Sequence, residues 1–335
     1  MLQPDDSPIK VSVLLAARNE EKNILRCLQA LHALHFPSEQ IEICIGNDHS
    51  TDQTAALIQQ FCKDKPSFRY FQIKTSTSHL QGKTNALAHL AHHARGEYFF
   101  YCDADIAVHP DWINTMLPLF KPETGIVVGI TRMKKGNWLA NMLSIEWLFI
   151  LTLVRLLSIF KIPVTALGNN MAVTRSAYFK VGGYEHMRFS IVEDYALFMQ
   201  IIQHGFGFTM GYQPTLISLS EPVENFDELN HQRKRWMKGV KESGWMVRAT
   251  IITASCIVPA TLLLFLTNTS LALTILFLHY ILITLFSIAS IIALKQFDLL
   301  KSVFAFWFYF SIYYTCMIYL YFSSGKITWR GRTYA

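Results

Sequence analysis

The chain has 335 residues, of which 51% are hydrophobic, 13% aromatic and only 16% charged, and its formal net charge is +6. Because typical globular domains carry about 25% charged residues, this composition excludes a disordered chain and a highly charged nucleic-acid-binding protein. The six cysteines form no C-x-x-C pair, which argues against a disulfide framework or a structural zinc site and indicates a reducing compartment for the polar part of the chain.

Three short apolar runs in the first third of the chain each end in polar residues and alternate with helical patterns. Near-continuous apolar strands separated by helices predict a mostly parallel sheet with right-handed crossovers. Open sheets of this kind bind ligands at the carboxyl ends of their strands. We therefore expect a site among the acids that follow the runs: 10–17 leading to Glu20, 41–46 to Asp48, and 97–102 to Asp103.

The segment GKT at 82–84 begins a helical pattern and looks like the end of a phosphate-binding P-loop. The first glycine of that motif is missing, so an ATPase is excluded, while Lys83 stays a candidate phosphate contact. On the same predicted helix, His89, His92 and His93 have a spacing that could bind metal. Without a nearby acid or cysteine, a solvated polar face is the better interpretation.

Asp103 and Asp105 flank one residue after the third run. Two carboxylates at this spacing can point into one cleft, where a divalent cation such as Mg²⁺ or Mn²⁺ relieves their repulsion and keeps positions open for phosphate oxygens. An Asp-x-Asp pair alone is more often a turn with helix-capping carboxylates, and Asp48 has a similar alternative as a loop acid.

A fourth apolar stretch, 138–162, contains Glu146 and Arg155. If it crossed a membrane, the motifs before and after it would lie on opposite sides. We therefore predict an amphipathic helix that lies on the bilayer or packs in the domain, with both ionisable residues facing water.

Two further polar segments precede the apolar end of the chain. Glu193 and Asp194 open a helical pattern, where they either stabilise the first turn through the helix dipole or supply a general base for an acceptor hydroxyl. The basic segment 231–236 either anchors a helix at lipid headgroups, or it pairs Arg235 with a diphosphate while Trp236 forms a wall of the site.

Beyond residue 248 come three apolar stretches, each long enough for a bilayer crossing of about 20 residues. The link between the first two is uncharged and the next link carries two lysines and one aspartate, so the positive-inside rule predicts that the second is cytoplasmic. Three full crossings would leave the basic tail, 326–332, outside. Either one stretch re-enters or lies in the interface, which we favour, or the tail is an external anchor. The stretches are 250–269, 271–294 and 302–323.

Taken in order, these segments resemble the inverting family 2 glycosyltransferases, in the membrane-bound branch with a Q-x-x-R-W signature. The resemblance covers residues 10–240 and implies a GT-A fold, in which a Rossmann-like, mostly parallel sheet is flanked by helices. That cytoplasmic domain, residues 1–240, would be followed by a helical transmembrane region, residues 241–335. The matching segments are VSVLLAARNEEKNI, IGNDHSTDQT, QGKTNAL, YCDAD, ALGNNMAVTRSAYFKVGGY, VED and HQRKRW.

The resemblance also implies a role for each matching residue. Asp48 would read the nucleotide base, Lys83 would help to hold the nucleotide, and Asp194 would be the catalytic base. Asp103 and Asp105 would hold the metal and the diphosphate. The other matches are Glu20 on the donor side; Gln232, Arg235 and Trp236 at the diphosphate and acceptor; Glu193, Asn169 and Asn170 on the acceptor side; and Trp329, Arg330 and Arg332, which look like a tryptophan–arginine motif that follows the membrane region.

The function implied is sugar transfer from a nucleotide-sugar, a UDP-sugar above all, to a hydroxyl of a membrane-associated lipid, with Mg²⁺ or Mn²⁺ as cofactor. Two alternatives stay open: a processive polysaccharide synthase, and a non-catalytic membrane scaffold that retains the fold. The expected location is the inner cell membrane, crossed several times, with membrane lipids and no nucleic acid as partners.

Overall fold

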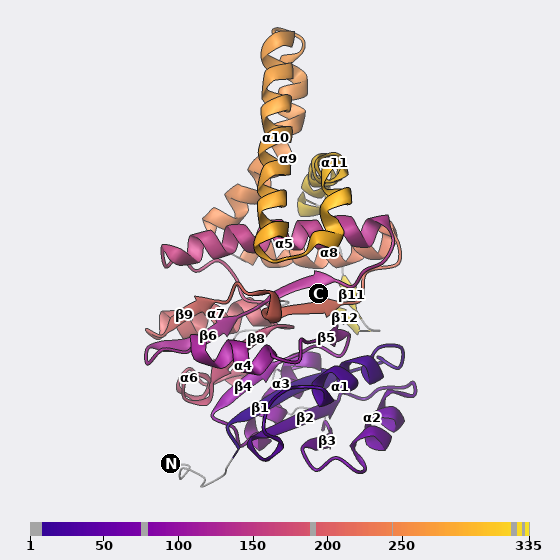
Figure 1. The fold of residues 1–335 in the computed structure, drawn as a ribbon, viewed down its shortest axis with the longest axis vertical. Helices are drawn as coiled ribbons and strands as arrows, with labels where there is room; N and C mark the ends of the chain where they lie inside the picture. Colours follow the sequence, from indigo (N-terminus) through magenta and orange to yellow (C-terminus); the bar gives the residue numbers. More distant parts are fainter. Residues whose placement is uncertain are drawn as a thin grey trace. The chain divides into compact units, whose positions relative to one another are not determined.

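The structure is a computed structural model that describes residues 9–74, 80–187, 192–242, 244–322, 327–329 and 332–334 (Figure 1). The chain divides into two compact units, which we call the first and the second unit. The first comprises Met1–Thr131 and Val154–Glu221, and the second comprises Arg132–Leu153 and Pro222–Ala335. This division differs from the boundary drawn after residue 240, since 132–153 and 222–240 join the apolar helices.

A mostly parallel sheet forms the centre of the first unit, as predicted. β1, β2, β3 and β4 pair in parallel, β8 is antiparallel to both β4 and β6, and β9 is parallel to β6. In the described residues the order of the strands is β3 (Phe68–Gln72), β2 (Ile41–Asn47), β1 (Val11–Ala17), β4 (Tyr98–Tyr101), β8 (Met171–Thr174), β6 (Thr124–Val128) and β9 (Gly207–Met210).

The central strands are mostly apolar because helices cover both faces of the sheet; Ser12 of β1 and Glu42 of β2 are buried exceptions. Val13 and Leu15 on one face of β1 share a buried cluster with Leu28 of α1, and Leu14 on the other face is fully buried as well. The helices of this unit are α1 (Ile24–His32), α2 (Thr54–Cys62), α3 (Gly82–His93), α4 (Trp112–Met116), α6 (Arg175–Lys180) and α7 (Glu193–Gln203).

Short elements connect these helices and strands. A second sheet has the order β5 (Ile106–Ala107), β10 (Ile217–Ser220) and β7 (Ile130–Met133). Single 3₁₀ turns are η1 (Ser38–Gln40), η2 (Leu117–Leu119), η3 (Tyr184–His186) and η4 (Pro214–Leu216).

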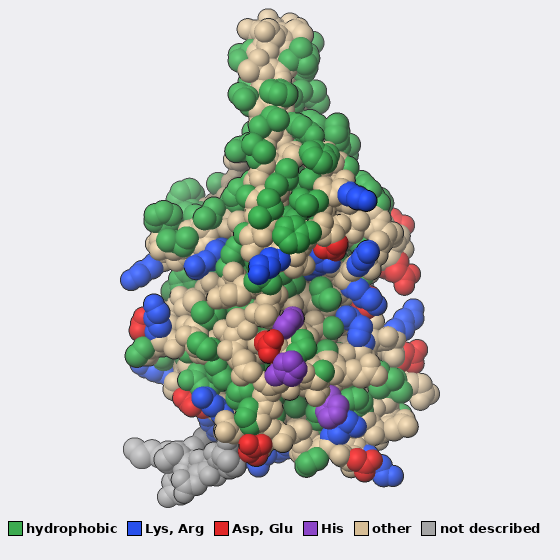
Figure 2. Space-filling model, viewed as in Figure 1, with side chains coloured by type: hydrophobic (Ala, Val, Ile, Leu, Met, Phe, Trp, Pro, Cys, Tyr) green, Lys and Arg blue, Asp and Glu red, His purple; other side chains and the backbone are tan. Residues whose placement is uncertain are grey.

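The second unit is built from long helices. α9 (Trp245–Leu264) and α10 (Thr269–Ala293) form a hairpin, and α5 (Trp138–Ile159) and α8 (Phe226–Glu242) run across its base (Figure 1). Hydrophobic side chains cover the hairpin surface (Figure 2). The chain continues through η5 (Phe297–Ser302) and α11 (Val303–Phe322) to a small antiparallel pair, β11 (Ile327–Trp329) and β12 (Arg332–Tyr334).

Among the described residues, four helices are long and apolar enough to cross a membrane: Trp138–Ile159, Trp245–Leu264, Thr269–Ala293 and Phe297–Phe322. The three predicted apolar stretches are therefore helical. The four helices differ in packing, because only 11% and 28% of the apolar windows of α9 and α10 are buried, against 50% in α5 and 44% in Phe297–Phe322. The hairpin is thus the part most exposed to its surroundings.

One expectation for α5 is wrong. Glu146 does not face water: its side chain is 0% exposed and accepts a hydrogen bond from Arg233 of α8 at 2.7 Å. The helix pattern alone predicted that Glu146 faces water, whereas the buried guanidinium of Arg233 in α8 supplies the partner that a buried carboxylate needs.

Candidate active site

The acids that follow β1, β2 and β4 lie at one edge of the sheet. β1 and β2 pair from Val11 with Ile41 to Ala17 with Asn47, and the Asp48 amide donates to the carbonyl of Ala17 at 2.9 Å. The Cys102 amide donates to the carbonyl of Leu14, so the loop after β4 begins at the same edge. The expected convergence of strand ends is present in the first unit.

The turn that carries Asp103 and Asp105 is fixed by neighbours on both sides. The guanidinium of Arg26 donates to the backbone carbonyl of Asp105, and its Nε lies 3.0 Å from Glu221 Oε1. Ser220 Oγ donates to Asp105 Oδ2 at 3.3 Å. Burial and the neighbouring Asp103 carboxylate raise the pKa of Asp105, so this pair of acids favours a cation beside it.

Lys83 joins two acids from distant parts of the chain. Its Nζ lies 2.7 Å from Asp103 Oδ1 and 3.0 Å from Glu193 Oε1, and the Lys83 side chain is 20% exposed. Burial disfavours the charged amine, but the carboxylates of Asp103 and Glu193 outweigh it and raise the pKa of Lys83. The first turn of α3 therefore presents a permanent cation between the loop after β4 and the start of α7.

Asp194 lies next to this cluster, in the first turn of α7. The Gly168 amide donates to its Oδ2 at 2.7 Å and the Tyr195 amide donates to its Oδ1 at 2.8 Å. Burial, followed by the neighbouring Glu193 carboxylate, raises the pKa of Asp194 to about 6 against the lowering effect of Lys83. A carboxylate with such a pKa is an effective proton acceptor near neutral pH.

Gly168 is required by the close packing around Asp194. A Cβ at position 168 would lie 3.0 Å from Asp194 Cβ and 3.1 Å from its Oδ2, so the Asp194 side chain would have to shift. The glycine lets the backbone amide reach the carboxylate. Neither Gly168 nor Arg26 was singled out from the sequence. Gly168 acts through its backbone amide, and Arg26 contacts residues far along the chain, so neither leaves a local pattern.

The remaining predicted residues of the first unit have defined partners. Asp48 is buried, with Oδ1 3.3 Å from His49 Nδ1, and the Glu20 carboxylate accepts from Asn23 at 2.9 Å. Asn169 Oδ1 accepts from Thr131 at 2.9 Å.

Asn170 was expected on the acceptor side, and its amide is fully buried. Its Nδ2 donates to the carbonyls of Ile130 at 2.6 Å and Leu216 at 2.8 Å, and its Oδ1 accepts from Trp112 at 2.8 Å. These bonds tie β7, η4 and α4 together. The arrangement favours a positioning role for Asn170 over direct contact with an acceptor.

The Q-x-x-R-W residues lie in α8 of the second unit. Gln232, Arg235 and Trp236 are all partly exposed, and the Trp236 ring meets that of Trp147 edge-on at 5.4 Å between centroids. In the tail, Arg330 lies outside the described residues, and the side chains of Trp329 and Arg332 lie outside them too.

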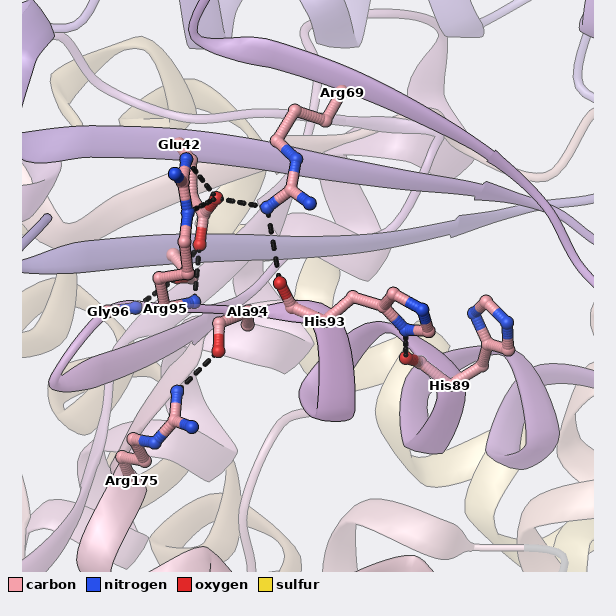
Figure 3. A network of polar contacts seen from close by, with 9 residues as sticks. Glu42, Arg69, His89, His93, Ala94, Arg95, Gly96 and Arg175 are labelled. Atoms are coloured by element: carbon pink, nitrogen blue, oxygen red, sulfur yellow. Dashed lines mark hydrogen bonds and ion pairs between the residues drawn. The ribbon is translucent and has the colours of Figure 1, made fainter. Parts of the chain in front are cut away.

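A different polar network lies at the amino end of β2 (Figure 3). The buried Glu42 carboxylate accepts from Ser12 Oγ at 2.7 Å and from the Arg95 amide at 2.6 Å. His93 Nδ1 donates to the carbonyl of His89 at 2.8 Å, and the two rings stack with centroids 4.4 Å apart. These contacts hold the end of α3 to the sheet, far along the strands from the acid cluster.

Comparison with known proteins gives concordant matches. The model of the family described as Glycosyl transferase family 21 matches residues 2–335. The chain is 29% identical over 240 residues to the probable glycosyltransferase YdaM of Bacillus subtilis. It is 28% identical over 235 residues to a poly-β-1,6-N-acetyl-D-glucosamine synthase of Staphylococcus epidermidis, and 29% over 237 residues to a β-monoglucosyldiacylglycerol synthase of Nostoc sp..

These alignments cover 69%, 69% and 68% of this chain but 55%, 55% and 48% of the relatives, so the chain spans about half the length of the curated relatives it matches. A mannosyltransferase from Pyrobaculum calidifontis, solved in complex with GDP-Man and Mn²⁺, aligns with a TM-score of 0.56 over 91% of this chain and 87% of that chain, at 14% identity. At this identity the likeness concerns the fold alone, and it confirms the predicted GT-A class.

Proposed function

Because the chain belongs to glycosyl transferase family 21, we propose that it transfers a sugar from a UDP-sugar to a hydroxyl of a membrane-associated lipid. The predicted resemblance to membrane-bound glycosyltransferases is confirmed, with the matched family numbered 21 instead of 2. The observation that carries the proposed reaction is the cluster in which Lys83 bridges Asp103 and Glu193 beside Asp194.

We assign the donor to the edge of the sheet that carries these acids. Asp48 at the end of β2 would contact the nucleotide base, and the Lys83 ammonium would pair with the diphosphate. For Gln232, Arg235 and Trp236 of the second unit, the resemblance implies contacts to diphosphate and acceptor. A bridging lysine suits this task because its charge is held in place before the anion arrives.

The acids also fit a divalent cation. Asp103 and Asp105 would hold Mg²⁺ or Mn²⁺, and no group of three or more His, Cys, Asp or Glu side chains in the described part of the chain could hold such an ion alone. Mg²⁺ is commonly bound by one or two carboxylates together with substrate phosphates, so two acids are a sufficient protein share. When bound, the ion would supply positive charge to the diphosphate leaving group.

The proposed reaction is a single displacement with inversion. The Asp194 carboxylate takes the proton of the acceptor hydroxyl while the hydroxyl oxygen bonds to the anomeric carbon of the sugar. The bond from that carbon to the diphosphate oxygen breaks, and the electron pair leaves with the nucleoside diphosphate. The amides of Gly168 and Tyr195 orient the Asp194 carboxylate for this transfer.

The proposed acceptor is a lipid because the catalytic residues share the chain with apolar helices and those helices are few. The β-monoglucosyldiacylglycerol synthase of Nostoc sp. is a relative of this kind, while the polysaccharide synthase of Staphylococcus epidermidis favours a growing polymer as the second candidate. Product analysis separates them: one sugar on a lipid supports the proposal, and a long chain contradicts it.

We further propose that only α9 and α10 cross the membrane fully. Within the second unit, Arg132 donates to Asp298 of η5 at 2.9 and 2.7 Å, and Lys241 Nζ lies 5.2 Å from the Tyr321 ring centroid. The turn η5 that precedes α11 thus contacts β7 and, through Asn141 and Ser302, α5; the last turn of α11 contacts α8, and so does β11. This supports a re-entrant or interfacial α11, with the C-terminus on the cytoplasmic side of the inner membrane.

Vesicles of known orientation test this topology. A C-terminal epitope tag should be removed by protease in inside-out vesicles and protected in right-side-out ones, while a cysteine at Thr267 should be labelled only from the opposite side. Protection of the tag in inside-out vesicles would contradict it.

The reaction itself is tested by nucleotide release. The full chain in detergent micelles with Mn²⁺ is offered a panel of UDP- and GDP-sugars with dioleoylglycerol as acceptor probe. Release of UDP that depends on the acceptor and is lost in Asp194→Asn supports the proposal. Absence of release from every donor, or full release by Asp194→Asn, would overturn it.

A further inference from the structure

A buried ion pair joins three helices of the second unit. Arg233 of α8 donates to Glu146 Oε2 of α5 at 2.7 Å, and the two side chains are 3% and 0% exposed. Two tyrosine hydroxyls of α11 also donate hydrogen bonds to the Glu146 carboxylate: Tyr309 to Oε2 at 2.9 Å and Tyr314 to Oε1 at 3.1 Å. A buried charge pair is stable only when further hydrogen bonds serve its other polar atoms. The two tyrosine hydroxyls do this for the carboxylate, whereas Arg233 Nε has no hydrogen-bond partner among the described residues.

Arg233 lies inside the Q-x-x-R-W segment and contacts its tryptophan. The guanidinium carbon lies 4.3 Å from the Trp236 ring centroid, a cation–π distance, while Trp147 meets the same ring edge-on. Trp236 therefore contacts both a buried cation of its own helix and an aromatic ring of α5.

The ion pair also determines which residues of α8 face away from it. Leu229, Arg233 and Met237 are buried at intervals of four residues and form the packed side of the helix. Successive residues turn by about 100°, so Arg235 lies roughly 200° from Arg233, on the opposite side. Any rotation of α8 that released Arg233 would redirect both Trp236 and Arg235.

We propose that Arg233 is a positioning residue of the transferase: Glu146, Tyr309 and Tyr314 hold it, and it holds Trp236 and the rotation of α8. Arg233 does not contact the substrate. That Arg233 holds the rotation of α8 is a claim about structure alone. That it thereby places Trp236 for the acceptor is a functional claim and rests on the proposed function. The two halves are therefore measured separately.

Hydrogen exchange measures the structural half on the full chain in detergent micelles. Tyr314→Phe removes one hydroxyl, Glu146→Gln removes the charge, and Tyr319→Phe is the matched control, since Tyr319 of the same helix is 76% exposed. We expect both cluster variants to raise exchange of the α8 amides severalfold, with Tyr319→Phe and the first unit unchanged. Unchanged α8 exchange in Tyr314→Phe, which is the mildest variant, would overturn the proposal.

A double-mutant cycle measures the functional half, with UDP-glucose as donor and dioleoylglycerol in mixed micelles as acceptor. Arg233→Lys keeps the charge but loses the planar contact, and it should raise the acceptor KM severalfold with a smaller change in kcat. In a Trp236→Leu background the same substitution should have little further effect, because coupled residues are not additive. Additive effects would overturn the role through Trp236. If the wild-type chain transfers nothing, the proposed function fails and the exchange result alone decides the positioning claim.

Discussion

Two clusters in which acids meet cations, one around Lys83 and one around Arg233, differ in charge balance and exposure, and the difference indicates what each does. Around Lys83, three carboxylates of the first unit gather near one ammonium, and the Lys83 side chain is 20% exposed. Around Arg233, one carboxylate accepts from one guanidinium and two hydroxyls, and the side chains of Arg233 and Glu146 are buried. The cluster around Lys83 has carboxylates in excess and can accept a ligand or a proton. In the cluster around Arg233 the carboxylate already accepts from the guanidinium and from two hydroxyls, so this cluster serves to hold helices together.

The largest effect that distinguishes the clusters is expected at Asp194. Asp194→Asn keeps the shape of the side chain but cannot accept the acceptor proton, so turnover should fall by about 10²–10⁴-fold. Binding of UDP, measured by calorimetry, should be retained. Asp64→Asn, a surface change in the same unit, is the control and should be silent; equal rates for the two variants would remove Asp194 from the mechanism.

A smaller but specific loss is expected at Asp105. Asp105→Ala removes one of two carboxylates for the cation, so UDP should bind weakly and with the same affinity in Mn²⁺ and in EDTA. The wild-type chain should lose affinity when EDTA replaces Mn²⁺. Binding that is indifferent to EDTA in the wild type would contradict a cation at this turn.

The pH profile reports on Lys83. Because Asp194 acts as the deprotonated base, wild-type turnover should rise with pH through about 6, where its carboxyl loses the proton. The charge of Lys83 lowers the pKa of Asp194, so Lys83→Met should move this limb to higher pH, with donor affinity reduced as well. A limb that stays in place would show that Lys83 does not act on Asp194.

The smallest change is expected at Gly168. A methyl group at this position meets Asp194 at about 3 Å, so Gly168→Ala should displace the carboxylate and lower kcat by about tenfold. The control is Gly244→Ala, because a Cβ added at Gly244 would meet no atom within 4 Å and this glycine, unlike Gly205, has no positive φ. Gly244→Ala should leave kcat unchanged, and a loss equal to that of Gly168→Ala would argue for a general effect of the added methyl group.

The sequence was sufficient to predict the strands and helices in which apolar residues follow one another along the element. Continuous apolar runs predicted β1, β2 and β4, and acids directly after them predicted the edge where the site lies, because parallel strands end together. The apolar helices followed from length and hydropathy in the same way.

Contacts between distant segments could not be read from such patterns. Arg26 holds the carbonyl of Asp105 from 79 residues away, and Glu146 finds Arg233 87 residues later. The helical pattern of 138–162 gives the face on which Glu146 lies but not the residue that packs against it. We therefore predicted from the sequence that Glu146 faces water. Gly168 was missed because its function is the absence of a side chain beside Asp194.

The central claim is that a nucleotide-sugar binds at the cluster around Lys83 in the first unit, and photolabelling tests it most directly. The full chain is illuminated with 5-azido-UDP-glucose and Mn²⁺, and the modified peptides are identified by mass spectrometry. We predict labelling of the peptide that contains Asp48, abolished by excess UDP and reduced in Asp105→Ala. Labelling confined to the helices of the second unit, or unaffected by UDP, would contradict the account.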